Sequence, residues 1–138
     1  MIAIDTNVAV RFLVADDVGQ FDRAKRIFET HQVFVPTSVL LETEWVLRDK
    51  YEVAKPAVTA ALRSLLKLPN VAAENRSCAL QALEWAEAGM DLADALRLAA
   101  SAQCSAFASF DMFRGYADRG DQFERLVQEL GAAPARSH

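Results

Sequence analysis

Short apolar segments alternate with longer amphipathic segments along this 138-residue chain. The apolar segments have the length of β-strands and lie at residues 1–5, 33–35, 71–73 and 106–110. Between and after them, apolar residues recur with a helical period over residues 8–14, 21–28, 39–50, 55–68, 76–88, 92–99 and 122–130. This alternation predicts an α/β fold, in which a mostly parallel sheet is covered by helices on both faces.

The composition is typical of a globular chain. Hydrophobic residues make up 52% and charged residues 25%, with five glycines and four prolines, which excludes disordered and collagen-like classes. The longest uncharged run, residues 98–110, is too short for a membrane-spanning helix, and no secretory signal is recognisable. We expect a single domain over residues 1–138, with residues 131–138 as a loosely ordered tail, located in the cytoplasm.

The sequence has too few histidines and cysteines to favour a catalytic or metal site built from these residues. The two histidines are His31 and the terminal His138, and the two cysteines, Cys78 and Cys104, lack the spacing of a metal clip or redox pair. We expect both cysteines to be small core residues with free thiols. If the chain is an enzyme, carboxylates carry its chemistry.

The net charge of −4 is distributed unevenly along the chain. Residues 1–70 hold nine basic and nine acidic residues, whereas residues 71–138 hold six basic and ten acidic residues. This balance argues against binding a phosphate backbone through charge alone, although an oxygen-ligated metal site would itself be acidic.

Four acids occupy positions that can converge on one edge of the predicted sheet. Asp5 and Asp111 directly follow predicted strands, and Glu42 and Asp94 lie on predicted helices in mainly apolar surroundings. The carboxyl ends of parallel strands lie at one edge, where ligands commonly bind. Carboxylates close together repel one another unless a cation offsets their charge, and a hard divalent ion would do so. Taken alone, Asp111 is equally consistent with a turn residue.

The other acids also have purely structural interpretations. Asp5 and Asp91 stand where helix N-caps belong, and Asp94 falls in a first helical turn, where the helix dipole favours an acid. Glu42 can belong to a solvated helix face, and for its neighbour Glu44 we expect this role. At the third helix we expect Thr37 or Ser38 to act as the N-cap.

Several motifs resemble those of a known family, in the same order. Residues 1–7, Met-Ile-Ala-Ile-Asp-Thr-Asn, resemble the start of a PIN domain, where a hydrophobic strand ends in Asp-Thr-Asn or Asp-Thr-Ser. Leu41-Glu42, residues 91–99 and residues 108–111, Ala-Ser-Phe-Asp, resemble its other motifs. The resemblance spans nearly the whole chain and is closest to VapC-type toxins of bacterial type II toxin–antitoxin pairs.

The resemblance implies a PIN-like three-layer α/β/α sandwich with a central, mostly parallel sheet. It also implies a Mg²⁺- or Mn²⁺-dependent endoribonuclease whose catalytic and metal-binding quartet is Asp5, Glu42, Asp94 and Asp111. Such a quartet would repel itself without metal, so we expect Asp94→Asn to leave the melting temperature of the metal-free protein unchanged or higher.

Further residues acquire roles from the same resemblance. Asp91, one helical turn before Asp94, is a further candidate metal ligand. Asn7 and Ser109 would orient carboxylates or the attacking water. Arg97 and Arg114 are candidate contacts for RNA phosphate, or ordinary surface arginines.

The implied partners are an RNA substrate, a cognate antitoxin and a second copy of the chain in a homodimer, without a membrane. The first three helices carry more apolar residues than one sheet face needs, and some of these can remain exposed to take an amphipathic helix of the antitoxin. These residues are Val8, Val10, Phe12, Leu13, Val14, Phe21, Ile27, Phe28, Leu40, Leu41, Trp45, Val46 and Leu47. The same residues can instead be core or homodimer contacts.

Two other functions remain open at this point. A catalytically silent PIN-like module that binds protein or RNA is supported by the residues after Asp111, because Met112, Phe113 and Arg114 stand where the family often has a further acid. A phosphatase with a strand-end Asp nucleophile is disfavoured by Asn7, because such enzymes carry a second Asp at that position.

Overall fold

The computed structural model describes residues 1–105 and 107, and it divides the chain into two units. The first unit is Met1–Ala79, and the second begins at Leu80. None of the helices in the described residues is long and apolar enough to cross a membrane.

A small parallel sheet forms the centre of the first unit. Its strands are β1 (Ile2–Ala3), β2 (Val33–Val35) and β3 (Val71–Ala73), in the order β1-β2-β3. Val33 on the central strand pairs with Ile2 on one side and Val71 on the other. The α/β class and the parallel sheet predicted from the sequence are therefore confirmed.

The first strand is less buried than expected. A strand over residues 1–5 in a sheet covered on both faces would be buried, but Ile2 is 37% exposed, Ala3 is exposed, and only Ile4 is buried. The reason is position, because β1 pairs with β2 alone within the described sheet, whereas β2 has a strand on either side. Accordingly, Val33 and Val35 of β2 are almost completely buried.

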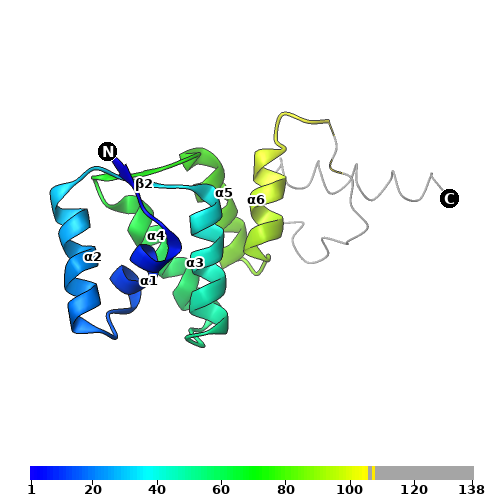
Figure 1. Cartoon of the computed structure of the whole chain (residues 1–138). Helices are drawn as coiled ribbons and strands as arrows, with labels where there is room; N and C mark the ends of the chain where they lie inside the picture. Colours follow the sequence, from blue (N-terminus) through cyan, green and yellow to red (C-terminus); the bar gives the residue numbers. More distant parts are fainter. Residues whose placement is uncertain (106, 108–138) are drawn as a thin grey trace. The chain divides into compact units, whose positions relative to one another are not determined.

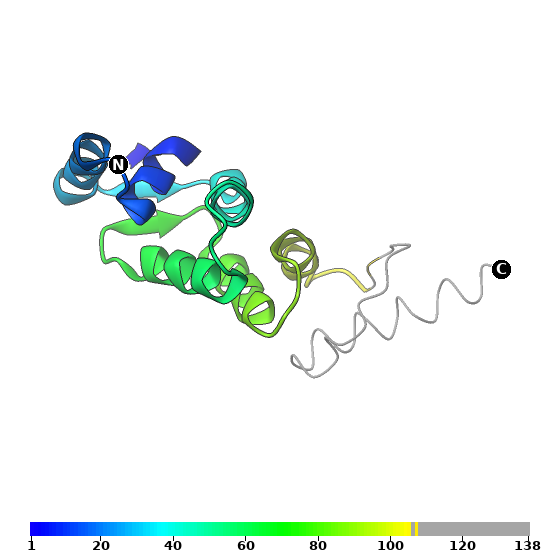
Figure 2. The same ribbon diagram turned by 90° about the horizontal axis from the view of Figure 1, so that it is seen from below.

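Four helices complete the first unit: α1 (Thr6–Val14), α2 (Val18–Thr30), α3 (Thr37–Asp49) and α4 (Lys55–Lys67). Figures 1 and 2 show α1 between α2 and α3. The contact between α1 and α2 is aromatic, since the Phe12 ring stacks on Phe28 with centroids 4.0 Å apart and lies 6.2 Å from Phe21. Such pairs add to the burial of apolar area.

The boundary between α1 and α2 explains how the two helices turn back on each other. Ala15 ends α1 in the left-handed conformation, with φ of 57°. Asp17 then caps α2, because its side chain accepts a hydrogen bond from the Gln20 backbone N–H at 3.0 Å. The connection is short, because Val18 and Gly19 already belong to α2.

Helix α4 and the central strand contribute several of the most deeply buried side chains of the first unit. Leu62, Leu65 and Leu66 of α4 are at most 1% exposed, as are Val33 and Val35 of β2. Burying a side chain of this size contributes about 1.5–3 kcal/mol. These apolar positions were predicted from the helical and strand periods.

The start of α3 differs from the expected capping. Neither Thr37 nor Ser38 is the N-cap, which is Pro36, and no side chain of the cap residue bonds the helix. Instead, the Thr37 backbone N–H donates to Oε1 of Glu74 at 3.1 Å. An acid that directly follows β3 thus satisfies the helix N-terminus, a long-range contact that local sequence does not reveal.

Two further helices follow β3. Helix α5 (Arg76–Glu87) runs across the boundary between the units, and α6 (Leu92–Ala100) lies in the second unit. Gly89 follows α5 with φ of 116°, a conformation that favours glycine and is common just after a helix. The expected strand 106–110, the helix 122–130 and the tail 131–138 lie outside the described residues.

The cysteines do not fit the prediction that both are core residues. Cys78 is half-buried and Cys104 is exposed, although neither forms a disulfide, as expected. Cys104 follows the end of α6 in a turn, where no apolar face requires it to be buried.

Candidate acidic site

Asp5 lies at the N-terminus of α1 and acts as its cap. Its Oδ1 atom accepts a hydrogen bond from the Val8 backbone N–H at 3.1 Å, and its backbone is extended. The structural interpretation of Asp5 is therefore confirmed. The side chain stays exposed to solvent, so a role in capping is compatible with a role as a ligand.

A side-chain hydrogen bond connects α1 to Glu42 on α3. The Thr6 hydroxyl donates to Oε1 of Glu42, and Glu42 itself is exposed. Because Thr6 directly follows Asp5, this bond ties Glu42 to the residue next to another of the predicted acids. Sequence reasoning did not single out Thr6 as a partner of Glu42, and its place within Asp-Thr-Asn was the signal that could have identified it.

Glu44 does not belong to a solvated helix face, contrary to expectation. It is 5% exposed, and its Oε2 atom lies 2.9 Å from Nε of Arg48, one turn further along α3. Residues two positions apart on a helix point about 200° away from each other, so Glu42 and Glu44 face opposite sides. The buried carboxylate is tolerated because Arg48 compensates its charge.

The acids of the second unit have confirmed structural roles. Asp91 is the N-cap of α6, and its Oδ2 accepts from the Asp94 backbone N–H at 3.2 Å. Asp94 is half-buried in the first turn, where its Oδ1 lies 3.0 Å from Nη1 of Arg97. The Arg97 guanidinium, a candidate RNA contact, therefore already bonds Asp94.

The described residues contain only part of the predicted constellation. Asp111, Ser109 and Arg114 lie outside them. Within residues 1–105 and 107, no group of three or more His, Cys, Asp or Glu residues is placed to hold a metal ion. The convergence of the four acids therefore stays a prediction.

The chemistry of the donor set fits the metal ions that the resemblance implied. Carboxylate oxygens are the hard ligands that Mg²⁺ and Mn²⁺ prefer. Asp5 and Glu42 offer such oxygens at exposed positions of the first unit, and Asp94 offers them in the second. Asn7 is exposed on the first turn of α1, two residues after Asp5.

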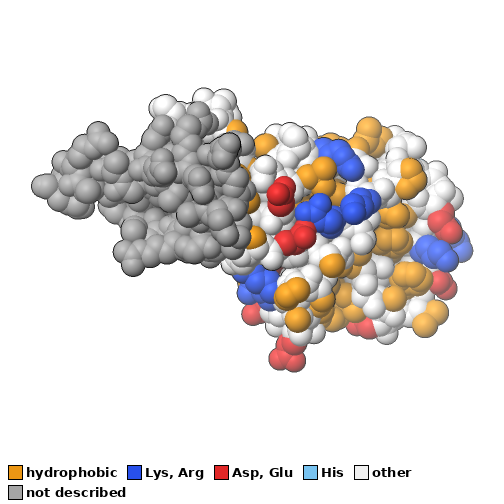
Figure 3. Space-filling view, turned by 180° about the vertical axis from the view of Figure 1, so that it is seen from behind, with side chains coloured by type: hydrophobic (Ala, Val, Ile, Leu, Met, Phe, Trp, Pro, Cys, Tyr) orange, Lys and Arg blue, Asp and Glu red, His pale blue; other side chains and the backbone are white. Residues whose placement is uncertain are grey.

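Charge on the surface is mixed, in keeping with the overall net charge of −4. On the described part of the face in Figure 3, basic and acidic side chains lie close to one another among apolar ones. Such a face gives a phosphate backbone no uniform positive potential to follow.

The amino-acid sequence was compared with known protein families and with curated proteins. The family model of the PIN domain matches residues 2–111, which include Asp5, Glu42, Asp94 and Asp111. No curated protein matches the chain. Because the family match covers most of the sequence and the fold is α/β with a parallel sheet, the protein belongs to the PIN domain family.

Proposed function

We propose that the protein is a metal-dependent endoribonuclease and the toxin of a VapC-type toxin–antitoxin pair. The observation that carries the proposal is the hydrogen bond from Thr6 to Glu42, because it joins Glu42 to the residue directly after Asp5 and both acids lie inside the PIN match. Membership of the PIN family supports a nuclease-type function.

The proposed reaction is hydrolysis of an RNA phosphodiester bond by the quartet Asp5, Glu42, Asp94 and Asp111. These carboxylates would hold Mg²⁺ or Mn²⁺, which supplies an activated water and offsets charge on the phosphoryl oxygens when bound. Asp91 is a further candidate ligand.

Neighbouring side chains hold carboxylate oxygens of the quartet through hydrogen bonds. Thr6 holds Oε1 of Glu42, so the other oxygen of this carboxylate can accept a proton from the attacking water. Arg97 fixes one oxygen of Asp94 in the same way. Asn7 and Ser109 would act as neutral supports, and Arg97 and Arg114 as RNA contacts.

A protein partner is supported by apolar side chains that stay partly accessible on α1, α2 and α3. Trp45 is 44% exposed, and Val8, Phe12, Ile27 and Leu41 are half-buried. Other residues of the same set, such as Val10, Phe28, Leu40 and Leu47, are core residues. The accessible side chains are suited to an amphipathic antitoxin helix or a homodimer contact in the cytoplasm.

Cleavage assays separate the proposed function from the other two. The purified protein is incubated with mixed RNA, and separately with a phosphomonoester, with Mg²⁺ and with chelator. We expect RNA cleavage that requires the metal and is lost in Asp94→Asn. Hydrolysis of the phosphomonoester would indicate a phosphatase instead, and binding without either reaction would indicate a silent module.

A growth assay tests the toxin role by itself. Expression of the protein alone is expected to stop growth, and the product of an adjacent small gene is expected to bind it, restore growth and block cleavage. If expression is harmless although the purified protein cleaves RNA, the toxin assignment fails and the nuclease assignment stands.

A further inference from the structure

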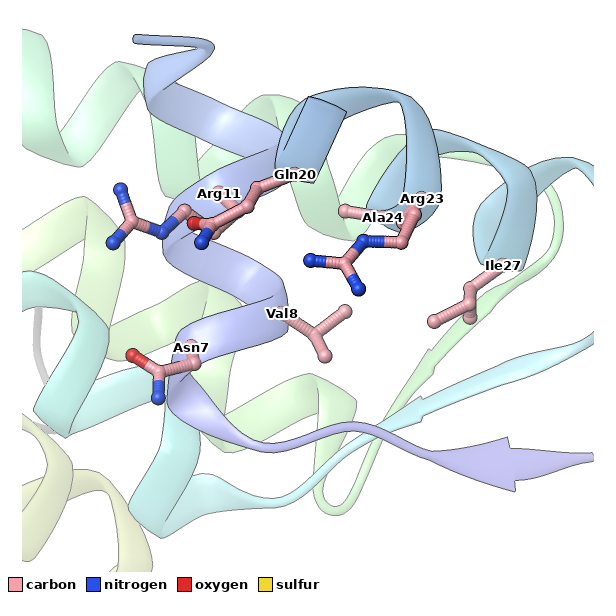
Figure 4. A pocket seen from close by; sticks show the side chains of 7 residues that line it. All are labelled: Asn7, Val8, Arg11, Gln20, Arg23, Ala24 and Ile27. Carbon is pink, nitrogen blue, oxygen red and sulfur yellow. The ribbon is translucent and has the colours of Figure 1, made fainter. Parts of the chain in front are cut away.

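An open pocket of about 410 Å³ lies between α1 and α2. It is lined by Asn7, Val8, Arg11, Gln20, Arg23, Ala24 and Ile27 (Figure 4). The lining begins at Asn7, two residues after Asp5, so the pocket adjoins the end of α1 that carries the candidate acidic site. Its volume is in the range of pockets that bind small molecules.

The charged residues of the pocket lining are both arginines. Arg11 is held in place, because its Nη1 lies 3.2 Å from Oδ1 of Asp16 and 3.2 Å from the Tyr51 hydroxyl. Arg23 is exposed, and within the described residues its guanidinium has no hydrogen-bond or ion-pair partner. Figure 4 shows this guanidinium extending over the pocket above Val8. The pocket therefore offers a positive group to an anion.

Gln20 supplies the second polar feature of the pocket. Its Oε1 atom is buried and has no hydrogen-bond donor in the part of the chain that the structure describes. Buried acceptors are nearly always paired, so this amide gains from a ligand that brings an N–H or O–H group to it. An inorganic anion alone would leave Oε1 without a donor.

The remaining lining is apolar. Val8 projects from α1, and Ala24 and Ile27 project from the facing turns of α2, as Figure 4 shows. Val8 and Ile27 are half-buried and keep accessible surface within the pocket. A flat ring can pack on such a surface.

We propose that this pocket binds one nucleotide of the RNA strand next to the cleaved bond. The phosphate of this nucleotide bonds Arg23, an O–H or N–H group of its ribose or base donates to Gln20, and its ring packs on Val8 and Ile27. An anion, a donor and a ring occur together within a single nucleotide, which is why RNA fits better than an acidic peptide. The inference rests on the proposed function, because it places the pocket beside the site of cleavage.

Binding of single-stranded RNA tests the phosphate contact without any cleavage. The full chain is titrated with a short RNA in chelator at several salt concentrations, as wild type, Arg23→Gln and Lys25→Gln. Lys25→Gln is the matched control, because it removes the same charge from an exposed position of α2. The Lys25 side chain points about 200° away from that of Arg23. We expect Arg23→Gln to bind several-fold more weakly, with a salt dependence shallower by about 0.7 in log K per log salt, and Lys25→Gln to bind like wild type. Equal affinity and slope for the two variants would overturn the proposal.

Gln20→Leu tests the second contact. This variant keeps the size of the side chain but removes both the acceptor and the donor. We expect it to change the nucleotide preference next to the cut, and to weaken binding of the ribonucleoside 5′-monophosphate that wild type binds best. Unchanged preference and affinity would refute the role of Gln20.

A competition experiment separates the two classes of ligand. A polyglutamate peptide that displaces RNA only weakly supports a nucleotide site. If the peptide binds wild type tightly but does not bind Arg23→Gln, and if RNA does not compete with the peptide, the pocket is a protein-docking site and the proposal is wrong. Arg23-dependent RNA binding by a protein that cleaves no RNA would refute the nuclease function and leave the pocket assignment intact.

Discussion

The hydroxyl of Thr6 donates a hydrogen bond to Oε1 of Glu42, and this bond joins the first residue of α1 to α3. The two residues are 36 positions apart in the sequence. The bond engages one oxygen of an exposed carboxylate, and the second oxygen takes no part in it. An acid that would otherwise sample many rotamers is thereby tied to Thr6, the residue that directly follows Asp5.

Thr6→Val is predicted to reduce RNA cleavage while the fold survives. Valine keeps the shape of threonine but cannot donate to Glu42, so the carboxylate loses its orientation. Removing such an outer-shell partner typically costs about 10- to 100-fold in activity, and the loss in unfolding free energy should be about 1 kcal/mol. Initial cleavage rates and thermal melting measure the two effects.

Thr6→Ser is the control for this variant. Serine restores the hydroxyl without the methyl group, so it should recover most of the cleavage rate. Equal losses in the valine and serine variants would show that the hydroxyl does not position Glu42.

Glu42→Gln and Glu44→Gln should have opposite consequences, although the residues are two positions apart. Glu42 is exposed, so its neutralisation should change the unfolding free energy by no more than about 0.5 kcal/mol but reduce cleavage by more than about 100-fold. Glu44 is buried against Arg48, so its neutralisation should lower the unfolding free energy by about 1–2 kcal/mol. The molecules that remain folded should still cleave RNA.

Denaturant titration and cleavage assays on both variants check this contrast. A stable Glu44→Gln protein without activity would reverse the two assignments.

Asp94→Asn should abolish cleavage and lower stability slightly. Repulsion among acids predicted an unchanged or higher melting temperature, but Asp94 also lies in the first turn of α6 and pairs with Arg97. The exposed ion pair and the interaction with the helix dipole are each worth a few tenths of a kcal/mol, so we expect a loss of about 0.5–1 kcal/mol in the metal-free protein. Arg97→Gln provides the comparison, because it removes the ion pair and keeps the acid.

Mg²⁺ or Mn²⁺ should raise the melting temperature of the wild-type protein, because the unfolded chain has no preformed site. A metal concentration 100 times the dissociation constant adds about 2.7 kcal/mol, or roughly 10 °C for a domain of this size. Asp5→Asn should show a much smaller shift, and asparagine still caps α1. Identical shifts in the two proteins would exclude Asp5 as a ligand.

The sequence by itself determined the class of fold and most of the helices and strands. The strands 33–35 and 71–73 lie where they were predicted, and the helices were recognised because their apolar faces repeat with a helical period. The caps Asp5 and Asp91 were also predictable, because a cap bonds the backbone of its own helix only a few residues away.

Only the tertiary structure decided which side chains meet across elements. Thr6 reaches Glu42, and Glu74 bonds the start of α3, through contacts between segments more than 30 residues apart. It also separated Glu42 from Glu44, since the side of a helix that becomes buried depends on the neighbouring elements and not on the charge of one residue. Periodicity and capping are local properties of the chain, whereas pairing and burial depend on how distant segments pack.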